Sequence, residues 1–320
     1  MSYGNRSMTT LYIDRKNASL DHDAGALIVH TRDDRNVFPL APVERIVLYG
    51  GGLRLTTRLL AACWERQIGL ITVTGRRQQA SARFPGRPPG DAGLRLAQYA
   101  AVQDDDWRAL AARRLIQAKF RAQLRRLGAL RPNARNGSAL AHGVAQITAQ
   151  LRHLHGETEP PAPASLVGIE GVAARAYFAA LSAQAPAGWA FHGRSRRPPR
   201  DPVNAALSLG YTLLHGEAVR ESQIAGFDPL LGFYHELDHG RESLACDVVE
   251  PLRPAIDGLV WRLFEERQLR PEHAHAEGEA CLLGKAGRAH FYEGYEAQAP
   301  TLRRQLRRIL KLVGEGMRAR

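Results

Sequence analysis

"RFPGRPPGDAG", residues 83–93, decides the fold of this chain, because it separates two parts with different patterns. Its three prolines and three glycines can sustain neither a helix nor a sheet. We therefore expect a linker over residues 86–96, which divides the 320-residue chain into a first domain, residues 1–85, and a second domain, residues 97–320.

The first domain is expected to be small and mainly β. Short runs of apolar and β-branched residues bounded by turn-forming residues are typical of strands. Such runs occur at Leu11–Ile13, Ala26–Val29, "VERIVLYG" (43–50) and "IGLITVTG" (68–75). Between the last two, "GGLRLTTRLLAACWERQ" (51–67) changes to the spacing of a helix. The pattern predicts a β domain with one short helix.

The second domain is expected to be all-α. "DDDWRALAARRLIQAKFRAQLRRLG" (104–128) begins with acids, which suit the N-terminus of a helix, and its apolar residues recur at helical spacing. Its basic residues, Lys119 among them, fit either a solvated helix face or a ridge that faces phosphates. A Pro-rich break, "HGETEPPAPAS" (155–165), interrupts the helices. The fold class is therefore α+β: a small N-terminal mainly-β domain followed by a larger all-α domain.

The charge balance indicates a polyanionic partner. Lys and Arg outnumber Asp and Glu by 44 to 32, which gives a formal net charge of +12. This surplus favours nucleic acid first and an anionic membrane second, although a basic protein without such a partner would carry it too. Three widely spaced cysteines without a C-x-x-C pair fit a reducing compartment. Because there is no apolar signal region and no run of about 18 apolar residues, we expect a cytoplasmic protein that does not span a membrane.

Glu170 falls on the side of its helix that is expected to pack. In "SLVGIEGVAARAYFAALSAQ" (165–184), Ser165 is the expected N-cap. Steps of three and four from Glu170 reach small or apolar residues such as Tyr177 and Leu181, and the small ones leave room around the carboxylate. The alternative is an acid that only complements the helix dipole.

Two further acids interrupt an apolar stripe in "GFYHELDHGRESLACDVVEPLRP" (232–254). Asp247 and Glu250 are three residues apart, so both project to one side of a helix. One interpretation is a capping box with Asp247 as the N-cap. However, apolar residues at helical spacing continue from 244 to 263, which places the acids inside a helix that Pro251 bends.

A cluster of arginines precedes the next helix. Asp201 and Pro202 are an N-cap and an N1 proline, so the basic, Pro-rich segment before them is expected to be an irregular loop. Guanidinium groups suit phosphate oxygens, although an exposed basic loop without a partner is the alternative. The arginines that we expect to contact DNA are Arg194, Arg196, Arg197, Arg200 and Arg253.

A divalent cation would account for the acids together with a histidine. His235 is either a structural histidine or a ligand, and His239 is the alternative ligand. Several carboxylates and an imidazole in an apolar domain are costly to leave unpaired. Oxygen ligands with one imidazole suit Mn²⁺ or Mg²⁺ better than Zn²⁺. Such an ion among arginines would polarise a phosphodiester and activate an attacking oxygen.

Four motifs in order resemble those of one family. They are "GIEGVAARAYF" (168–178), "GRSRRPPRDPVNAALSLGYTLL" (193–214), "GFDPLLGFYH" (226–235) and "SLACDVVEPLRP" (243–254). From "LYID" (11–14) to its Arg-rich C-terminal helix, the chain resembles the CRISPR-associated integrase and endonuclease of spacer acquisition, the Cas one family.

The resemblance implies a set of metal ligands. The metal glutamate of the family falls on Glu170, its metal histidine on His235, and its third acid on Glu250, directly before "PLRP". Asp247 matches another acid of the motif and takes a supporting role. Because some members carry Asp where Glu250 stands, the choice of third ligand between Asp247 and Glu250 is left open. The implied ion is Mn²⁺ or Mg²⁺.

The resemblance also implies the reaction and the partners. It implies a metal-dependent DNA endonuclease and integrase that inserts short foreign DNA into a CRISPR array by transesterification from a 3′-hydroxyl. The expected partners are double-stranded and branched DNA, a second copy of the chain bound through the N-terminal domain, and the small protein Cas two. In the implied assembly, two dimers flank one Cas two dimer. The segment 131–165 fits the family only loosely, so its role is open.

Two other functions fit the same features. A DNA-binding architectural subunit with a degenerate metal site would keep the basic surface and its salt dependence but would show no turnover. A nuclease of branched DNA junctions would cleave without ever integrating.

Overall fold

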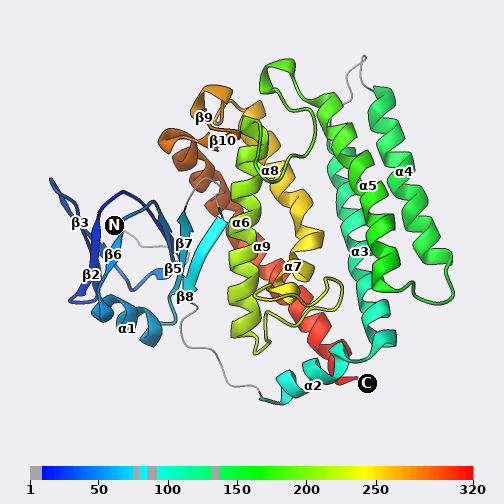
Figure 1. The fold of residues 1–320 in the computed structure, drawn as a ribbon, viewed down its shortest axis with the longest axis horizontal. Helices are drawn as coiled ribbons and strands as arrows, with labels where there is room; N and C mark the ends of the chain where they lie inside the picture. The colour runs from blue at the N-terminus through cyan, green and yellow to red at the C-terminus, as the bar shows by residue number, and fades with distance from the viewer. Residues whose placement is uncertain (1–8, 75–78, 85–91, 131–136, 320) are drawn as a thin grey trace, which may run out of the picture. The chain divides into compact units, whose positions relative to one another are not determined.

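Figure 1 shows the computed structural model, which describes residues 9–74, 79–84, 92–130 and 137–319. The chain divides into two compact units, Met1–Pro89 and Gly90–Arg320, called here the N-terminal and the C-terminal unit. Most of the predicted linker, residues 86–96, lies outside the described residues. Its last part is helical, because α2 (Ala92–Val102) begins there.

The described residues of the N-terminal unit form two four-stranded sheets and one helix. The first sheet has the order β1-β5-β7-β8, with β1, β5 and β7 parallel and β8 antiparallel to β7: Thr9–Asp14, Val43–Tyr49, Gly69–Thr74 and Gln79–Phe84. The second has the order β4-β3-β2-β6: Arg35–Pro39, Ala26–His30, Ser19–Asp23 and Arg54–Leu55. Both sheets and helix α1 (Thr57–Glu65) share one core, in which Leu20, Ile46 and Leu59 are fully buried.

The predicted strands β1, β3, β5 and β7 and the predicted helix α1 are present, but β2, β4, β6 and β8 were not predicted, and β6 lies in the segment 51–67 that was expected to be helical. The sequence of β2 is "SLDHD", in which Leu20 is the one buried apolar residue. Pairing with β3 on one side and β6 on the other makes this polar segment a strand. The segment is too short and too polar to show the alternation of apolar and polar residues from which a strand is predicted.

The C-terminal unit is a helical domain. Figure 1 shows α3, α4 and α5 side by side, and α3 also contacts α8, which packs with α6 and α9. The remaining helices are α3 (Asp105–Gly128), α4 (Gly137–Gly156), α5 (Pro163–Gln184), α6 (Pro202–Ile224), α7 (Ser243–Val249), α8 (Arg253–Glu265) and α9 (Lys285–Arg318), with short 3₁₀ turns η1 (Ala187–Trp189), η2 (Glu250–Leu252) and η3 (Pro271–His273).

This unit is not wholly α-helical as predicted, since β9 (Ala274–Glu277) and β10 (Ala280–Leu283) form an antiparallel hairpin. Gly278 sits at its turn with a φ of 62°, a conformation that costs glycine little. The first strand is almost entirely exposed, so it has no apolar pattern from which to predict it.

Capping residues determine where helices α3 and α6 begin. Asp104 accepts the backbone N–H of Trp107 at 3.0 Å as the N-cap of α3, and acids fill the first turn of that helix while arginines fill its last. Asp201 caps α6 in the same way, with Pro202 at N1, as predicted. The N-cap of α5 is Ala162, however, and the predicted cap Ser165 lies within the helix.

Among the described residues, α5 is the one helix that is long and apolar enough to cross a membrane by length and composition. It packs against both α3 and α4, and its residue Glu170 is half-buried. A core helix meets the same criteria of length and composition.

Candidate active site

Five segments of the C-terminal unit line one cavity of about 660 Å³, and the loop before α6 contributes Arg196. α3 contributes Lys119, α5 contributes Glu170, the loop between α6 and α7 contributes His235, and the turn η2 contributes Glu250. The three predicted metal ligands therefore line the same cavity. The alternative histidine, His239, is exposed and does not line it.

The turn η2 interrupts the apolar stripe that the sequence predicted to be one bent helix. Leu244, Leu252 and Leu263 are buried, so the stripe itself is as expected. Pro251 has no N–H for an α-helical hydrogen bond, and the chain passes from α7 through η2 into α8. Glu250 opens this turn, which aims its carboxylate at α3.

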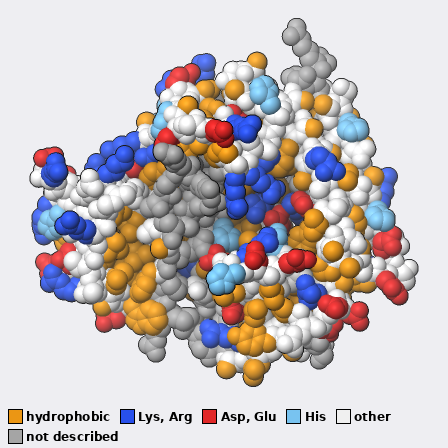
Figure 2. Space-filling model, viewed as in Figure 1, with side chains coloured by type: hydrophobic (Ala, Val, Ile, Leu, Met, Phe, Trp, Pro, Cys, Tyr) orange, Lys and Arg blue, Asp and Glu red, His pale blue; other side chains and the backbone are white. Residues whose placement is uncertain are grey.

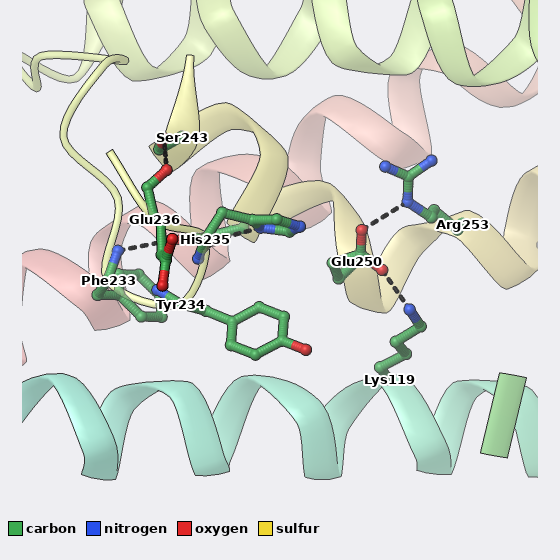
Figure 3. A network of polar contacts seen from close by, with 9 residues as sticks. Lys119, Phe233, Tyr234, His235, Glu236, Ser243, Glu250 and Arg253 are labelled. Carbon is green, nitrogen blue, oxygen red and sulfur yellow. Dashed lines mark hydrogen bonds and ion pairs between the residues drawn. The ribbon is translucent and has the colours of Figure 1, made fainter. Parts of the chain in front are cut away.

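The ammonium of Lys119 contacts two of the glutamates that line the cavity, Glu170 and Glu250. Its Nζ donates to Glu170 Oε1 at 2.7 Å and to Oε2 of Glu250. From the other side, Arg253 Nε donates to Glu250 Oε1 at 2.8 Å (Figure 3). The Lys119 and Glu250 side chains are each only 8% exposed, so water screens this ion pair little.

These contacts determine the charge of Glu250. Burial alone raises the pKa of its carboxyl group, but the positive charges of Arg253 and Lys119 outweigh burial and hold the pKa well below its usual range. The neighbouring hydroxyl of Tyr234 shows the opposite effect. Burial, and then the negative charges of Glu170 and Glu250, raise the pKa of Tyr234. The site therefore contains an ionised Glu250 beside a neutral phenol at neutral pH.

Asp247 holds the loop that carries His235. The Asp247 side chain is fully buried in α7, and its Oδ2 accepts the backbone N–H groups of Phe233 at 2.6 Å and Tyr234 at 3.1 Å. Its Oδ1 accepts the backbone N–H of His235 at 2.9 Å and lies 2.7 Å from the ring Nδ1. These four contacts use the acceptor capacity of the carboxylate.

This arrangement corrects one interpretation of the sequence and fixes the state of the imidazole. Asp247 lies inside α7 and caps no helix, so the capping box does not form. An ionised carboxylate only accepts hydrogen bonds, so Nδ1 of His235 carries the proton that faces Asp247. The lone pair of a neutral imidazole is then on Nε2, which is the nitrogen left for a ligand.

Gly232 lets the loop approach α7 closely enough for these contacts. A Cβ at this position would lie 2.6 Å from Asp247 Oδ2 and 2.6 Å from the backbone carbonyl carbon of Ser243. Neither atom can move easily, because the first is hydrogen-bonded twice and the second belongs to the first turn of α7. Only glycine fits here.

The five arginines predicted to contact DNA fall into two groups. Arg196 lines the cavity, and Arg197 and Arg200 are exposed on the same loop. Arg194 instead turns inward, where it donates to Asn204 Oδ1 at 2.8 Å and lies over the ring of Tyr211.

Arg253 also lies over the ring of Tyr211, with its guanidinium 4.8 Å from the ring centroid, while its Nε holds Glu250. Arg194 and Arg253 therefore make contacts within the protein that position the basic loop and Glu250, and their contact with DNA stays a prediction.

Several side chains that line the cavity were missed in the sequence. Arg108, Tyr234 and Arg241 line it together with Lys119, and Figure 2 shows Lys and Arg side chains gathered near α6 and α8 with acidic and histidine side chains close by. A signal for Lys119 was present. It lies four residues after Leu115, on the buried stripe of α3 where an apolar residue is expected, and not on a solvated face.

The side chains of this cavity suit a divalent cation. Two carboxylates already converge on one positive charge, and the imidazole of His235, whose Nδ1 faces Asp247, lines the same cavity. Within the part of the chain that the structure describes, no three His, Cys, Asp or Glu side chains are already close enough to hold an ion. The donor set therefore fits Mn²⁺ or Mg²⁺ in type, while the ammonium of Lys119 holds the place between the carboxylates.

Comparison with known proteins identifies the family. The family model described as CRISPR associated protein Cas1 matches residues 11–297. A curated relative, CRISPR-associated endonuclease Cas1 1 of Thermodesulfovibrio yellowstonii, is 35% identical over 293 residues, which cover 90% of this chain and 91% of the relative. The chain belongs to the Cas1 family. The α+β fold predicted from the sequence is confirmed by comparison with solved structures. A Cas1 protein from Thermotoga maritima superimposes with a TM-score of 0.84 over 97% of both chains, at 23% identity.

Two other solved structures of the same fold hold an integration product or include Cas2. A casposase bound to an integration product has a TM-score of 0.76 and 20% identity, and the match covers 91% of this Cas1 chain and 82% of the casposase. A Cas6-RT-Cas1–Cas2 complex has a TM-score of 0.83 and 21% identity, and the match covers all of this chain and 36% of the other.

Proposed function

We propose that this Cas1 protein is a nuclease and integrase of CRISPR adaptation that acts on DNA phosphodiester bonds. The observation that carries the proposal is the convergence of Glu170 and Glu250 on one positive charge, in a cavity that His235 and Arg196 also line. The curated relative at 35% identity is named an endonuclease, and a casposase of the same fold was solved on an integration product.

Glu170, Glu250 and the Nε2 of His235 would hold Mn²⁺ or Mg²⁺, which supplies charge stabilisation at the phosphate and activation of the attacking oxygen. Asp247 does not act as the third ligand in this proposal. Its four contacts to the loop and ring make it a positioning residue that keeps Nε2 directed at the cavity. The contacts of Arg253 position Glu250 in a similar way.

The proposed reaction is transesterification, in which the 3′-hydroxyl of a short captured DNA attacks a phosphodiester of the repeat array. The bond between the 3′-oxygen and phosphorus forms as the bond to the original 3′-oxygen of the array strand breaks. Arg196 on the basic loop and Arg108 and Arg241 at the cavity wall would hold the phosphates on either side of the reacting group. Tyr234, kept neutral, is a hydroxyl donor beside them.

The proposed partners are double-stranded and branched DNA, a second copy of the chain joined through the N-terminal unit, and Cas2. The basic composition and the cavity arginines support DNA. The Cas6-RT-Cas1–Cas2 complex of the same fold supports Cas2, with two Cas1 dimers around one Cas2 dimer as the proposed assembly. The setting is the cytoplasm, where the CRISPR array lies.

The deciding experiment is strand transfer of a duplex with free 3′-hydroxyls into a target that contains a repeat, with Mn²⁺ or Mg²⁺, with and without Cas2. Glu170→Gln and His235→Ala should abolish joining while circular dichroism and DNA affinity stay as in the wild type. Glu293→Gln, at an exposed position of α9, is the matched control and should join normally. Full joining by either cavity variant would refute the proposal.

Two outcomes would favour the other functions. A wild-type protein that binds DNA but shows no turnover with either ion would be an architectural subunit. Cleavage of branched DNA without any joining, even with Cas2, would indicate a junction nuclease.

The DNA path is tested separately by salt. If Arg196 and Arg197 each contact a phosphate, their replacement by Ala should reduce the slope of log K against log salt by about 0.9 per residue. Arg32→Ala, an exposed arginine of the N-terminal unit, serves as the control and should leave the slope unchanged. An unchanged slope in the Arg196 and Arg197 variants would place the DNA elsewhere.

A further inference from the structure

Lys119 occupies a position that helices normally give to an apolar residue. It lies on the buried side of α3 with Leu115, Ile116 and Phe120, and its side chain is 8% exposed. A lysine is rarely buried unless it is paired. Its ammonium is paired twice, with Glu170 Oε1 at 2.7 Å and with Oε2 of Glu250.

The ammonium and a divalent cation cannot share this place. An ion bound to both glutamates would lie about 2.0–2.6 Å from their oxygens. The Nζ of Lys119 already lies 2.7 Å from one of these oxygens and contacts the other. An ion that uses the same pair of oxygens must therefore move the ammonium away.

Without an ion, the carboxylates of Glu170 and Glu250 are already paired with positive charges. Lys119 and Arg253 contribute two positive charges beside the two carboxylates. Arg253 bonds the other oxygen of Glu250, at 2.8 Å, so it stays on this carboxylate while Oε2 is released. The ammonium of Lys119 is therefore the cation that a metal ion would displace.

We infer that Lys119 is a displaceable counter-cation, a positioning residue that holds Glu170 and Glu250 in the metal-free protein and is expelled when the ion binds. The inference rests on the proposed metal site and deepens it. Room for the displaced side chain exists, because Lys119 borders both the main cavity and a smaller adjoining one lined by Tyr211 and Arg194. Displaced toward the main cavity, the ammonium adds a positive charge beside the proposed phosphate position.

Displacement makes metal binding a competition. Removing the ammonium leaves two carboxylates without their shared partner and lifts the repulsion between Lys119 and the incoming ion. The Lys119→Met variant, which keeps the length and apolar stem of the side chain, should therefore bind Mn²⁺ about tenfold or more tightly than the wild type. Lys119→Arg retains the charge and should not gain affinity.

The experiment is calorimetric titration of the full-length protein with Mn²⁺ in the absence of DNA. Besides the two Lys119 variants, Lys311→Met serves as the matched control. Lys311 is an exposed lysine on α9, so this substitution removes the same charge outside the cavity. Of the variants, we expect only Lys119→Met to have a lower Kd for Mn²⁺. Its thermal midpoint without metal should be lower than that of the wild type, and Mn²⁺ should raise this midpoint by more than it raises that of the wild type. Equal or weaker Mn²⁺ binding by Lys119→Met would overturn the inference.

A measurement on the wild type keeps the test valid if Lys119→Met fails to fold. The chain has only four lysines, Lys16, Lys119, Lys285 and Lys311. In protein labelled with ¹³C at the lysine Cε, the Lys119 signal, assigned by its loss in Lys119→Arg, should shift when Mg²⁺ is added while the other signals stay in place. A Lys119 signal that does not respond to saturating Mg²⁺ would refute displacement.

Failure of the inference and failure of the proposed function give different results. If wild-type protein binds Mn²⁺ through Glu170 and His235 but Lys119→Met binds it no more tightly, only the inference is wrong. If the wild type binds no Mn²⁺, or binds it equally well in Glu170→Gln and His235→Ala, both are wrong.

Discussion

Replacing Asp247 by Asn removes one acceptor atom from the buried carboxylate that fixes the His235 loop. The carboxylate accepts the backbone N–H groups of Phe233, Tyr234 and His235 and faces the ring Nδ1. An Asn amide has one oxygen, so in either orientation its NH₂ group meets two donors. Each buried donor left without an acceptor costs about 1–3 kcal/mol, so the variant should lose about 1–6 kcal/mol of unfolding free energy, according to whether one or two donors are left unpaired.

The two orientations of the amide differ in their effect on His235. With its oxygen toward Phe233 and Tyr234, the amide NH₂ faces the ring, and Nδ1 must become the acceptor. The ring proton then moves to Nε2, and the nitrogen that faces the cavity loses its lone pair. With the reverse orientation the ring keeps its state, but the backbone N–H groups of Phe233 and Tyr234 lose their acceptor. Either outcome weakens the proposed metal site.

Three measurements check this prediction: urea unfolding for the free energy, calorimetry for Mn²⁺ affinity, and ¹⁵N chemical shifts of labelled histidine for the tautomer. Asp238→Asn is the matched control, because Asp238 lies in the same loop but is exposed and bonds only the backbone N–H of His239. A loss of less than about 1 kcal/mol in Asp247→Asn, combined with wild-type Mn²⁺ affinity, would refute the positioning role of Asp247.

Two further predictions concern packing and pH. Gly232→Ala should cost about 1–3 kcal/mol of unfolding free energy and weaken Mn²⁺ binding, because its Cβ would lie 2.6 Å from Asp247 Oδ2 and from the Ser243 backbone. The control is Gly168→Ala on α5, whose Cβ would meet no atom within 4 Å. Equal stability of the two variants would contradict the close approach at Gly232. Burial raises the pKa of the Cys63 thiol from 9.0 to about 11, so the folded state disfavours the thiolate. The contribution of the protonated thiol to the stability of the folded protein is therefore fully present below pH 9 and is lost as the pH rises to about 11. The free energy of unfolding of the wild type should therefore fall by about 2–3 kcal/mol more over this interval than that of Cys63→Val, and parallel pH profiles would show that the thiol ionises freely.

The sequence predicted the elements whose signals are local. Strands β1, β3, β5 and β7 carry their own apolar runs, and α6 carries its own cap and N1 proline. The strands β2, β4 and β9 were missed, because their largely polar or exposed residues become strands only through pairing with a neighbour. The N-cap of α5 was predicted three residues late, since no side chain caps that helix.

The candidate site was predicted in part for the same reason. Glu170, His235 and Glu250 were chosen through motifs that resemble a family, and the structure brings all three to one cavity. The position of Arg194 was not predictable from composition, because a guanidinium on a basic loop can face DNA or an aromatic ring equally well. Its contacts with Asn204 and Tyr211 exist only once α6 is folded.

By itself, the sequence determined which helices and strands can form and which side chains are able to bind a cation, because spacing, caps and residue chemistry are properties of short segments. Only the tertiary structure decided what each charged group does. Lys119 of α3 meets glutamates 51 and 131 residues further along the chain, and Asp247 of α7 meets a loop 12 to 14 residues before it. A buried charge is tolerated only beside its partner, and partners this distant in the chain become neighbours through helix packing.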